Sequence, residues 1–143
     1  MTFSTKTAYG LVALIELADV HADGGVLQTG EIARRQGIPE RYLEQMLSSL
    51  RRSGLLRSIR GPRGGFQLTR PPETITVAEV FTCLEGAAAA QPEHQHCTGA
   101  FQVLTALAQK VEQARTRVLA ATTLQQLLEQ RNAMARPPLM YHI

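Results

Sequence analysis

This chain has little cysteine and no long apolar run. The first shortage argues against a disulfide-stabilised protein, and the second against a membrane-spanning one. The 143 residues include only two cysteines, Cys83 and Cys97, which are too few for a disulfide framework. No apolar run approaches the roughly 20 residues that a helix needs to cross a bilayer. The opening residues, MTFSTKTAYG, lack the charged start and apolar core of a signal peptide. We therefore expect a cytoplasmic protein with no membrane partner, whose cysteines are free thiols or ligands.

Acidic residues are missing from one stretch of the sequence. Between Arg51 and Arg70 there are six arginines and no acidic residue, although the net charge of the whole chain is only +3. Residues 1–72 hold ten Lys and Arg against six Asp and Glu, whereas residues 73–143 hold five against six. This uneven distribution predicts a polyanion-binding module joined to a part of the chain with another role.

Two helices are predicted before the arginine-rich stretch. The apolar spacing predicts a first helix over residues 5–21, capped by Ser4 or Thr5. A second helix of about two turns is predicted with Thr29 as its cap and Gly37 at its end. A helix this short is not stable alone, so we expect it to pack on its neighbours.

A third helix and a hairpin make up the arginine-rich stretch itself. The helix is predicted to start with Pro39 in its first position, and its inward stripe to hold Tyr42, Leu43, Met46, Leu47 and Leu50. Residues 55–59 and 65–68 are predicted strands around a tip of glycine, proline and arginine. This order of elements predicts a mainly α protein with a small β-hairpin, namely a winged helix-turn-helix domain.

The second half of the chain is predicted to contain a helix of a different kind. Thr76 with Glu79, and later Thr123 with Gln126, form capping boxes that open two short helices. Between those helices, residues 100–121 are predicted to form a long helix. It carries a seam of coiled-coil type, made by Leu104, Leu107, Val111, Ala114 and Val118.

The outer face of the third helix and the hairpin carry side chains that suit nucleic acid. Arg41 and Gln45 can read purine edges, and Glu44 can accept a hydrogen bond from cytosine N4. Arg60 and Arg63 suit a narrow minor groove, where the negative potential is strongest. The residues predicted to contact the bases or phosphates of double-stranded DNA are Lys6, Thr29, Glu40, Arg41, Tyr42, Glu44, Gln45, Ser48, Arg60 and Arg63.

Each of these features has a simpler interpretation when it is taken alone. A helix face of Glu, Arg and Gln is most often just solvated. An arginine-rich hairpin can instead dock an acidic protein, which makes an interaction adaptor the alternative function. Catalysis is not expected, because the turn from Gly61 to Gly65 lacks the GxxxxGK[ST] pattern of a phosphate loop. The joint occurrence of the features favours DNA binding, without a small-molecule substrate.

The motif YLEQMLSSLRRSGLLRSIRGPRGGFQL resembles the signature of the Rrf-type family of bacterial transcriptional regulators, the IscR, NsrR and CymR type. The segments STKTAYGLVALIELA, EIARRQGIP and TTLQQLL resemble that family as well. The resemblance implies a homodimer that binds an inverted-repeat operator, with DNA contacts at Glu44 and Arg60 and a long dimerisation helix that carries the seam. We therefore expect a winged helix-turn-helix DNA-binding domain over residues 1–85, a sensor or linker loop over 86–99, and a dimerisation helix with a short helix and tail over 100–143.

The cysteines of the predicted loop depart from the family pattern. Many relatives hold an iron–sulfur cluster with three cysteines before the long helix, whereas this loop has Cys97 alone, close to His94 and His96. One alternative is that these three residues, with Cys83 or a group from a partner subunit, hold a cluster or another soft metal. A second is that Cys97 is a redox-sensing thiol, and a third is a linker without a ligand. Cys83 stands among apolar residues and is predicted to pack in the core.

Overall fold

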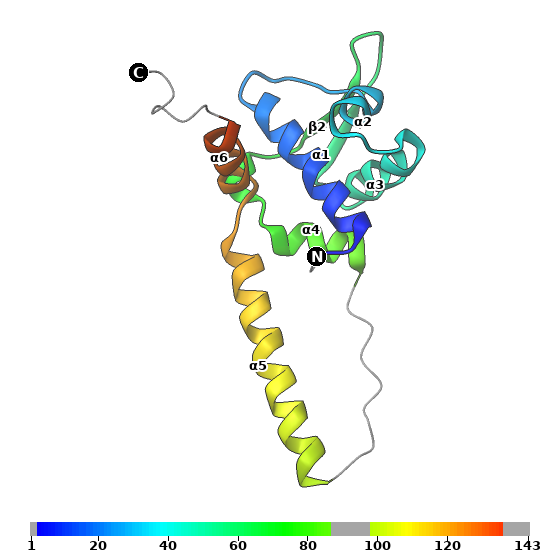
Figure 1. Ribbon diagram of the computed structural model, residues 1–143. Coiled ribbons are helices and arrows are strands. Elements are labelled where there is room, and N and C mark those ends of the chain that lie inside the picture. Colours follow the sequence, from blue (N-terminus) through cyan, green and yellow to red (C-terminus); the bar gives the residue numbers. More distant parts are fainter. Residues whose placement is uncertain (1–2, 87–97, 136–143) are drawn as a thin grey trace.

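The protein is described by a computed structural model that covers residues 3–86 and 98–135, most of them helical (Figure 1). The elements are α1 (Thr5–His21), α2 (Thr29–Gln36), α3 (Glu40–Arg52), β1 (Leu56–Ile59), β2 (Gly65–Leu68), the 3₁₀ helix η1 (Pro72–Thr74), α4 (Val77–Glu85), α5 (Gly99–Ala121) and α6 (Leu124–Ala135). The predicted mainly α fold with one small hairpin is confirmed. Most of the predicted loop over residues 86–99 lies outside the described residues.

Short local signals set most of the helix ends. Ser4 caps α1, since its hydroxyl accepts a hydrogen bond from the N–H of Thr7 at 3.2 Å. Thr76 caps α4 in the same way, which is one half of the predicted capping box, whereas the Glu79 carboxylate pairs with Arg70. At the start of α6, the Thr123 N–H donates to Gln126 Oε1 at 2.9 Å, and the Gln126 N–H donates back to Thr123 Oγ1 at 3.2 Å. This reciprocal pair confirms the predicted capping box.

The starts of α2 and α3 differ from the prediction by one residue. Thr29 is the first residue of α2 rather than its cap, and the cap position is held by Gln28, whose side chain makes no capping hydrogen bond. Pro39 occupies the cap position of α3, because its ψ of 125° is still extended and the helical turn begins only at Glu40. Gly37 ends α2 with a left-handed φ of +65°, as expected for a glycine stop.

The hydrophobic core lies around α1, which contacts α2, α3, α4, α6 and the second strand. This central helix contributes apolar side chains to a single cluster with its neighbours. The largest fully buried side chains in the cluster are Leu14, Leu17, Ile32, Leu43, Met46, Leu47, Leu50, Leu56, Leu68, Ile75, Val80 and Leu124. The helix-turn-helix is therefore held from behind by α1, as its short second helix requires.

The hairpin is joined to the rest of the domain through the loop before α2. Strands β1 and β2 are antiparallel, with Leu56 opposite Leu68 and Ile59 opposite Gly65. Leu27 pairs with Phe66 through two further backbone hydrogen bonds, of 3.0 and 2.8 Å. This third segment joins the wing at the tip-side end of the ladder, where Phe66 lies opposite Ser58, while the tip itself extends away from the helices (Figure 1).

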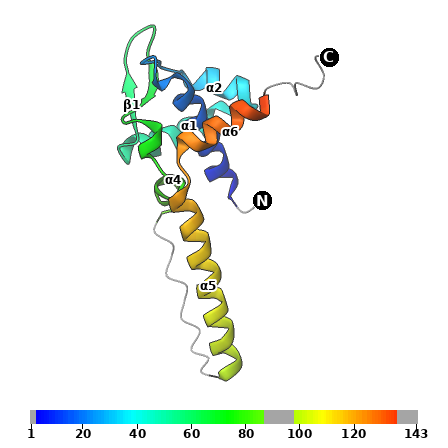
Figure 2. The same ribbon diagram turned by 90° about the vertical axis from the view of Figure 1, so that its left-hand side faces the viewer.

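Helix α5 projects from the body of the domain, and α6 returns to it (Figures 1 and 2). None of the residues of α5 is buried, whereas Leu124 and Leu128 of α6 belong to the core beside α1. The division of the chain at residues 85 and 100 stays a prediction, but α6 packs with the N-terminal helices rather than with α5. Within residues 3–86 and 98–135, no helix is both long and apolar enough to span a membrane.

Candidate nucleic-acid interface

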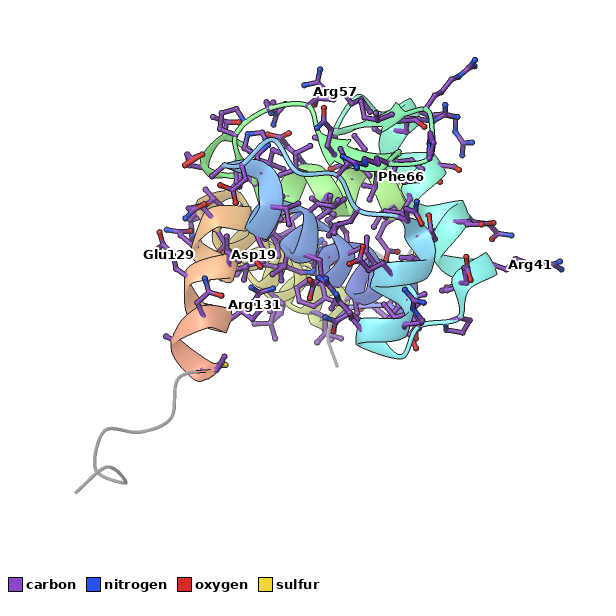
Figure 3. The ribbon with its side chains drawn as sticks, turned by 90° about the horizontal axis from the view of Figure 1, so that it is seen from above. Asp19, Arg41, Arg57, Phe66, Glu129 and Arg131 are labelled. Carbon is purple, nitrogen blue, oxygen red and sulfur yellow. The ribbon has the colours of Figure 1, made fainter. Side chains whose placement is uncertain are left out.

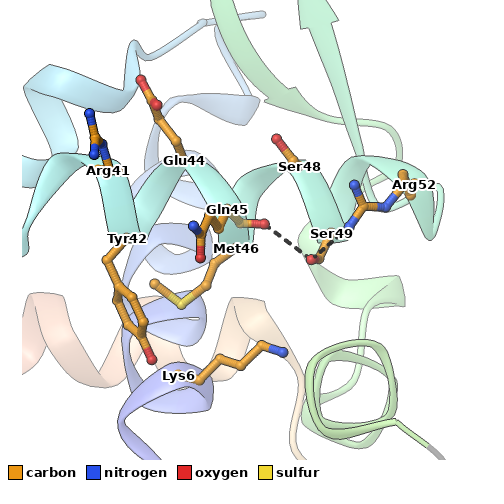
Figure 4. Close-up of a pocket in the computed structure, with 9 residues that line it drawn as sticks. All are labelled: Lys6, Arg41, Tyr42, Glu44, Gln45, Met46, Ser48, Ser49 and Arg52. Atoms are coloured by element: carbon orange, nitrogen blue, oxygen red, sulfur yellow. Dashed lines mark hydrogen bonds between the residues drawn. The ribbon is translucent and has the colours of Figure 1, made fainter.

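The outer face of α3 forms one wall of a shallow groove that the first turn of α1 completes (Figure 4). Apolar residues on the opposite side of α3, including Leu43, Leu47 and Leu50, are fully buried, so the helix has one defined outward face. The groove is lined by Lys6, Arg41, Tyr42, Glu44, Gln45, Met46, Ser48, Ser49 and Arg52. Six of the ten predicted DNA-binding residues are thus brought together on one surface.

The predicted base-reading side chains of α3 are accessible. Arg41, Glu44 and Gln45 are exposed and Ser48 is half-buried. Seen from above, Arg41 projects away from the domain (Figure 3). These side chains include both hydrogen-bond donors and hydrogen-bond acceptors, and discrimination between base pairs in the major groove requires both.

Tyr42 does not belong to the inward stripe, and that part of the prediction is wrong. Its side chain is 37% exposed, and its ring meets that of Tyr9 edge to face, with centroids 5.8 Å apart. The Tyr42 hydroxyl points toward the first turn of α1, where Lys6 lies (Figure 4). Tyr42 lies at the edge of the apolar stripe, where its ring packs against Tyr9 of α1 at the surface instead of entering the core.

Two further polar residues of the groove, Ser49 and Arg52, were expected on the outer face of the helix but not among the predicted DNA contacts. The Arg52 guanidinium donates to Ser49 Oγ at 3.2 Å, and that hydroxyl donates to the Gln45 carbonyl oxygen at 3.1 Å (Figure 4). Arg52 follows Ser48 by four positions, which puts both on one face of a helix. That spacing is the signal that could have identified Arg52.

The N-terminus of α2 and the start of α3 meet at Gly30. A Cβ at this glycine would lie 3.1 Å from Glu40 Oε1, which places the exposed Glu40 carboxylate next to the first turn of α2. The Thr29 side chain is buried, with 9% exposure, so a phosphate contact there would involve the helix terminus rather than the hydroxyl.

The wing carries cations that are free for a ligand. Arg57, Arg60 and Arg63 are exposed, and none of the ion pairs within residues 3–86 and 98–135 involves them. Arg70, at the base of the hairpin, is different, because it pairs with Glu79 and donates to the Thr74 carbonyl oxygen. The basic charge at the tip is therefore not neutralised within the described part of the chain.

A carboxylate ties the end of α4 to the start of α1, next to the groove. Hydrogen bonds from the Ser4 hydroxyl and, at 2.5 Å, from the Thr7 hydroxyl lower the pKa of Glu85. The charges of Lys6 and Arg115 lower this pKa further, and desolvation opposes the shift. Glu85 thus stays ionised and holds the turn that presents Lys6 to the groove.

The predicted dimerisation residues form an exposed apolar face on α5. Leu104, Leu107, Val111 and Val118 are each 56–64% exposed, and Ala114 is exposed as well. On the side of α5 that faces the domain, the Arg115 guanidinium lies 4.2 Å from the centroid of the Phe81 ring. The apolar side chains thus extend along a helix that its own domain leaves largely uncovered (Figure 2).

The residues predicted to bind a metal or sense redox state lie mostly outside the described part. His94, His96 and Cys97 are not among the described residues. Cys83 is half-buried on α4 and packs against the core, as predicted. Residues 3–86 and 98–135 contain no group of three His, Cys, Asp or Glu side chains that could hold a metal ion.

Comparison with known proteins assigns the chain to a family. The Rrf2 family model, described as an iron-dependent transcriptional regulator, matches residues 3–130. The chain belongs to the Rrf2 family. This confirms the resemblance inferred from the YLEQ to FQL motif, and the winged helix-turn-helix fold with it.

Relatives within the Rrf2 family are named as transcriptional regulators. The chain is 44% identical over 86 residues to the regulator IscR of Cereibacter sphaeroides, a match that covers 59% of this chain and 56% of IscR. It is equally similar over 86 residues to CymR of Bacillus subtilis, where the match covers 60% of this chain and 62% of CymR. The chain thus spans little more than half the length of these curated relatives.

Solved structures match over more of the chain. The structure of CymR, the global cysteine regulator of B. subtilis, has a TM-score of 0.78 and 35% identity, with 91% of this chain and 98% of that one covered. IscR from T. potens has a TM-score of 0.80 and 34% identity, with 99% and 96% covered. The Rrf2 fold therefore includes α5 and α6 as well as the winged helix.

Proposed function

We propose that this Rrf2-family protein is a sequence-specific DNA-binding transcriptional regulator that acts as a homodimer on an inverted-repeat operator. The observation that carries the proposal is the outward face of α3, where Arg41, Glu44 and Gln45 are exposed on a helix whose other face is buried. An α-helix fits the major groove, and these side chains match its donors and acceptors.

The wing supplies affinity rather than base choice. Arg60 and Arg63 have no ion-pair partner among the described residues, so binding to DNA breaks no such pair. Their positive charge suits phosphates and the minor groove beside the site of α3. Lys6, Tyr42 and the N-terminus of α2 would fix the register on the backbone.

The homodimer is proposed from the face of α5. A row of apolar side chains at coiled-coil spacing on a projecting helix is stable in water only when a partner covers it. A second copy of the chain offers the same row, and twofold symmetry then requires an operator with two inverted half-sites. Because its target would be chromosomal DNA, we propose that the protein works in the cytoplasm.

Titration of fluorescent duplexes at several salt concentrations tests DNA binding. Arg60→Ala should weaken binding to all sequences and reduce the slope of log K against log salt by about 1, since one phosphate contact is lost. Arg117→Ala removes the same charge from the exposed surface of α5 and should leave the slope unchanged. If the purified protein ignores DNA at low salt, the proposal fails.

Base choice is tested by selecting binding sequences from a random pool. Glu44→Ala should change the preferred base at one position of each half-site, because the acceptor for cytosine N4 is lost. Overall affinity for mixed-sequence DNA should change far less than it does in Arg60→Ala. An unchanged preference would show that Glu44 takes no part in recognition.

The response to iron or redox state is a separate proposal that rests on Cys97. The donor set does not fit the family's three-cysteine cluster, because the chain has two cysteines and Cys83 packs against the core. Absorption spectra with iron and sulfide analysis of protein purified without oxygen test what remains. Visible bands that disappear in Cys97→Ala would establish a cluster, and equal DNA binding by a colourless protein in both redox states would remove both sensor alternatives.

A further inference from the structure

A buried carboxylate in the C-terminal half of α1, that of Glu16, connects two helices that are far apart in the sequence. Glu16 is only 7% exposed, yet it has polar partners on two other helices. From α2, Arg35 Nη1 lies 3.3 Å from Glu16 Oε2, and Gln36 Nε2 donates to Glu16 Oε1 at 2.5 Å. From α6, Arg131 Nη1 lies 3.5 Å from Glu16 Oε1.

The α6 side of this cluster has a second contact on α1. Arg131 Nη2 lies 3.0 Å from Asp19 Oδ2, and the two labelled side chains lie side by side in Figure 3. With its contact to Glu16, one guanidinium therefore pairs with two carboxylates that are three positions apart on α1. A buried carboxylate is costly unless cations and donors compensate it, so Glu16 depends on both of its sides. A displacement of α6 would remove Arg131 from Glu16 and would thereby change the interaction of Glu16 with Arg35 and Gln36 in the last turn of α2.

The two ends of this ion-pair chain have different proposed roles. At one end, α2 leads through the glycine turn at Gly37 into α3, whose outer face lines the groove. At the other end, α6 continues directly from α5, which carries the apolar seam. Backbone hydrogen bonds fasten the junction of α5 and α6 to the body, from the Val77 N–H to the Thr122 carbonyl at 2.8 Å and from the Leu124 N–H to the Ile75 carbonyl at 3.0 Å.

We propose that Arg131 is a positioning residue for DNA binding, which acts through Glu16 to set the orientation of α2 and α3 relative to the α5–α6 arm. The proposal rests on the function proposed above. Arg131 is not among the residues that line the groove. In a dimer joined through α5, this orientation fixes the separation of the two recognition helices, and hence whether both half-sites can be contacted at once.

Docking of α6 does not by itself depend on Arg131. Leu124 and Leu128 are buried in the core and hold the helix against α1 whether or not the guanidinium is present. The Asp19 pair is partly exposed on both sides and adds little to stability, and Glu16 keeps Arg35 and Gln36 as partners when Arg131 is replaced. The role that we propose for the Arg131 ion pairs is to fix the angle at which the docked α6 lies against α1.

The test compares Arg131→Gln with the matched variant Arg117→Gln, which removes the same charge from an exposed arginine outside every ion pair of the described residues. Affinity is measured for a selected duplex with both half-sites and for a duplex with one. Arg131→Gln should lose about tenfold on the full operator and less than about twofold on the single half-site. Arg131→Lys should restore most of the loss, and sedimentation should show the same dimer in all variants.

A second measurement needs no DNA. Hydrogen exchange of the α2 amides should become faster in Arg131→Gln, while that of the α4 amides stays unchanged. Equal losses on both duplexes, or an α2 exchange rate equal to that of Arg117→Gln, would overturn the positioning role. Wild-type protein that binds no duplex would overturn the proposed function instead, and the exchange result would still decide whether α6 and α2 are coupled.

Discussion

The attachment of the wing should fail when Gly65 is replaced by alanine. Gly65 is the first residue of β2 and faces the backbone of the loop before α2. A Cβ at this position would lie 2.4 Å from the Leu27 carbonyl oxygen and 2.6 Å from its carbon, both closer than real contacts allow. The glycine also has a φ of +154°, which side chains rarely adopt.

The size of the effect follows from the contacts that must separate. Leu27 can retreat only by breaking its two backbone hydrogen bonds with Phe66, of 3.0 and 2.8 Å. At a net 0.5–1.5 kcal/mol each, their loss costs about 1–3 kcal/mol. Backbone strain adds about 1 kcal/mol. We expect a total loss of about 2–4 kcal/mol in the free energy that holds the hairpin in place.

Alanine substitutions at two other glycines distinguish the cost of the steric clash at Gly65 from the cost of backbone strain. Gly61 has a φ of +110°, and a Cβ added there would meet nothing within 4 Å, so Gly61→Ala should cost only the strain, about 1–2 kcal/mol. Gly99 has neither a positive φ nor a close neighbour, and Gly99→Ala should stay within about 0.5 kcal/mol of the wild type. Urea unfolding at one fixed protein concentration measures all three variants.

Hydrogen exchange at Leu27 and Phe66 reports the detachment directly. Both amides should exchange faster in Gly65→Ala than in either control, because they are the donors of the broken pair. Binding to mixed-sequence DNA should weaken as well, since Arg60 and Arg63 would no longer be held beside α3. If Gly65→Ala unfolds and exchanges like Gly99→Ala, the assignment of the Leu27–Phe66 pair as the anchor of the wing is refuted.

Three further perturbations test the other parts of the structure. Leu107→Glu places a charge on the exposed apolar face of α5 and should weaken dimerisation more than about tenfold by sedimentation, whereas Gln109→Glu on the opposite face should not; equal behaviour would exclude this seam as the interface. Thr123→Ala removes the cap of α6 and should lower the free energy of unfolding by about 1 kcal/mol in urea, and an unchanged midpoint would contradict the capping role. Glu85 has a lowered pKa in the folded protein, so its contribution to stability is present above the ordinary range of a glutamate and is lost as the pH falls through the lowered pKa. The stability difference between wild type and Glu85→Gln should therefore shrink below about pH 4, and a difference that is constant from neutral to acidic pH would refute it.

Local features of the sequence were enough to predict the elements. The apolar spacing of α1, the Thr76 cap, the capping box at Thr123 and the glycine stop at Gly37 depend only on residues a few positions apart. The same holds for the hairpin and for the outward face of α3. Such signals act within one turn or one strand pair, so they can be read from spacing alone. The family resemblance was confirmed on the same segments.

Local spacing could not predict the contacts between elements. Tyr42 follows the periodicity of a core residue, but its partner Tyr9 on α1 keeps it at the surface beside Lys6. Nothing near Leu27 in the sequence indicates that it pairs with Phe66.

Local sequence signals specify which segments are helices, which form the wing and which face of α3 is polar. The tertiary structure decided that α6 returns to α1, and that Glu16, an acidic residue within an apolar helix, is compensated by Arg35 from one side and Arg131 from the other. The physical reason is that the free energy of burying a charge depends on partners brought close by the packing of whole helices. Residues from opposite ends of the sequence can then stabilise the same carboxylate.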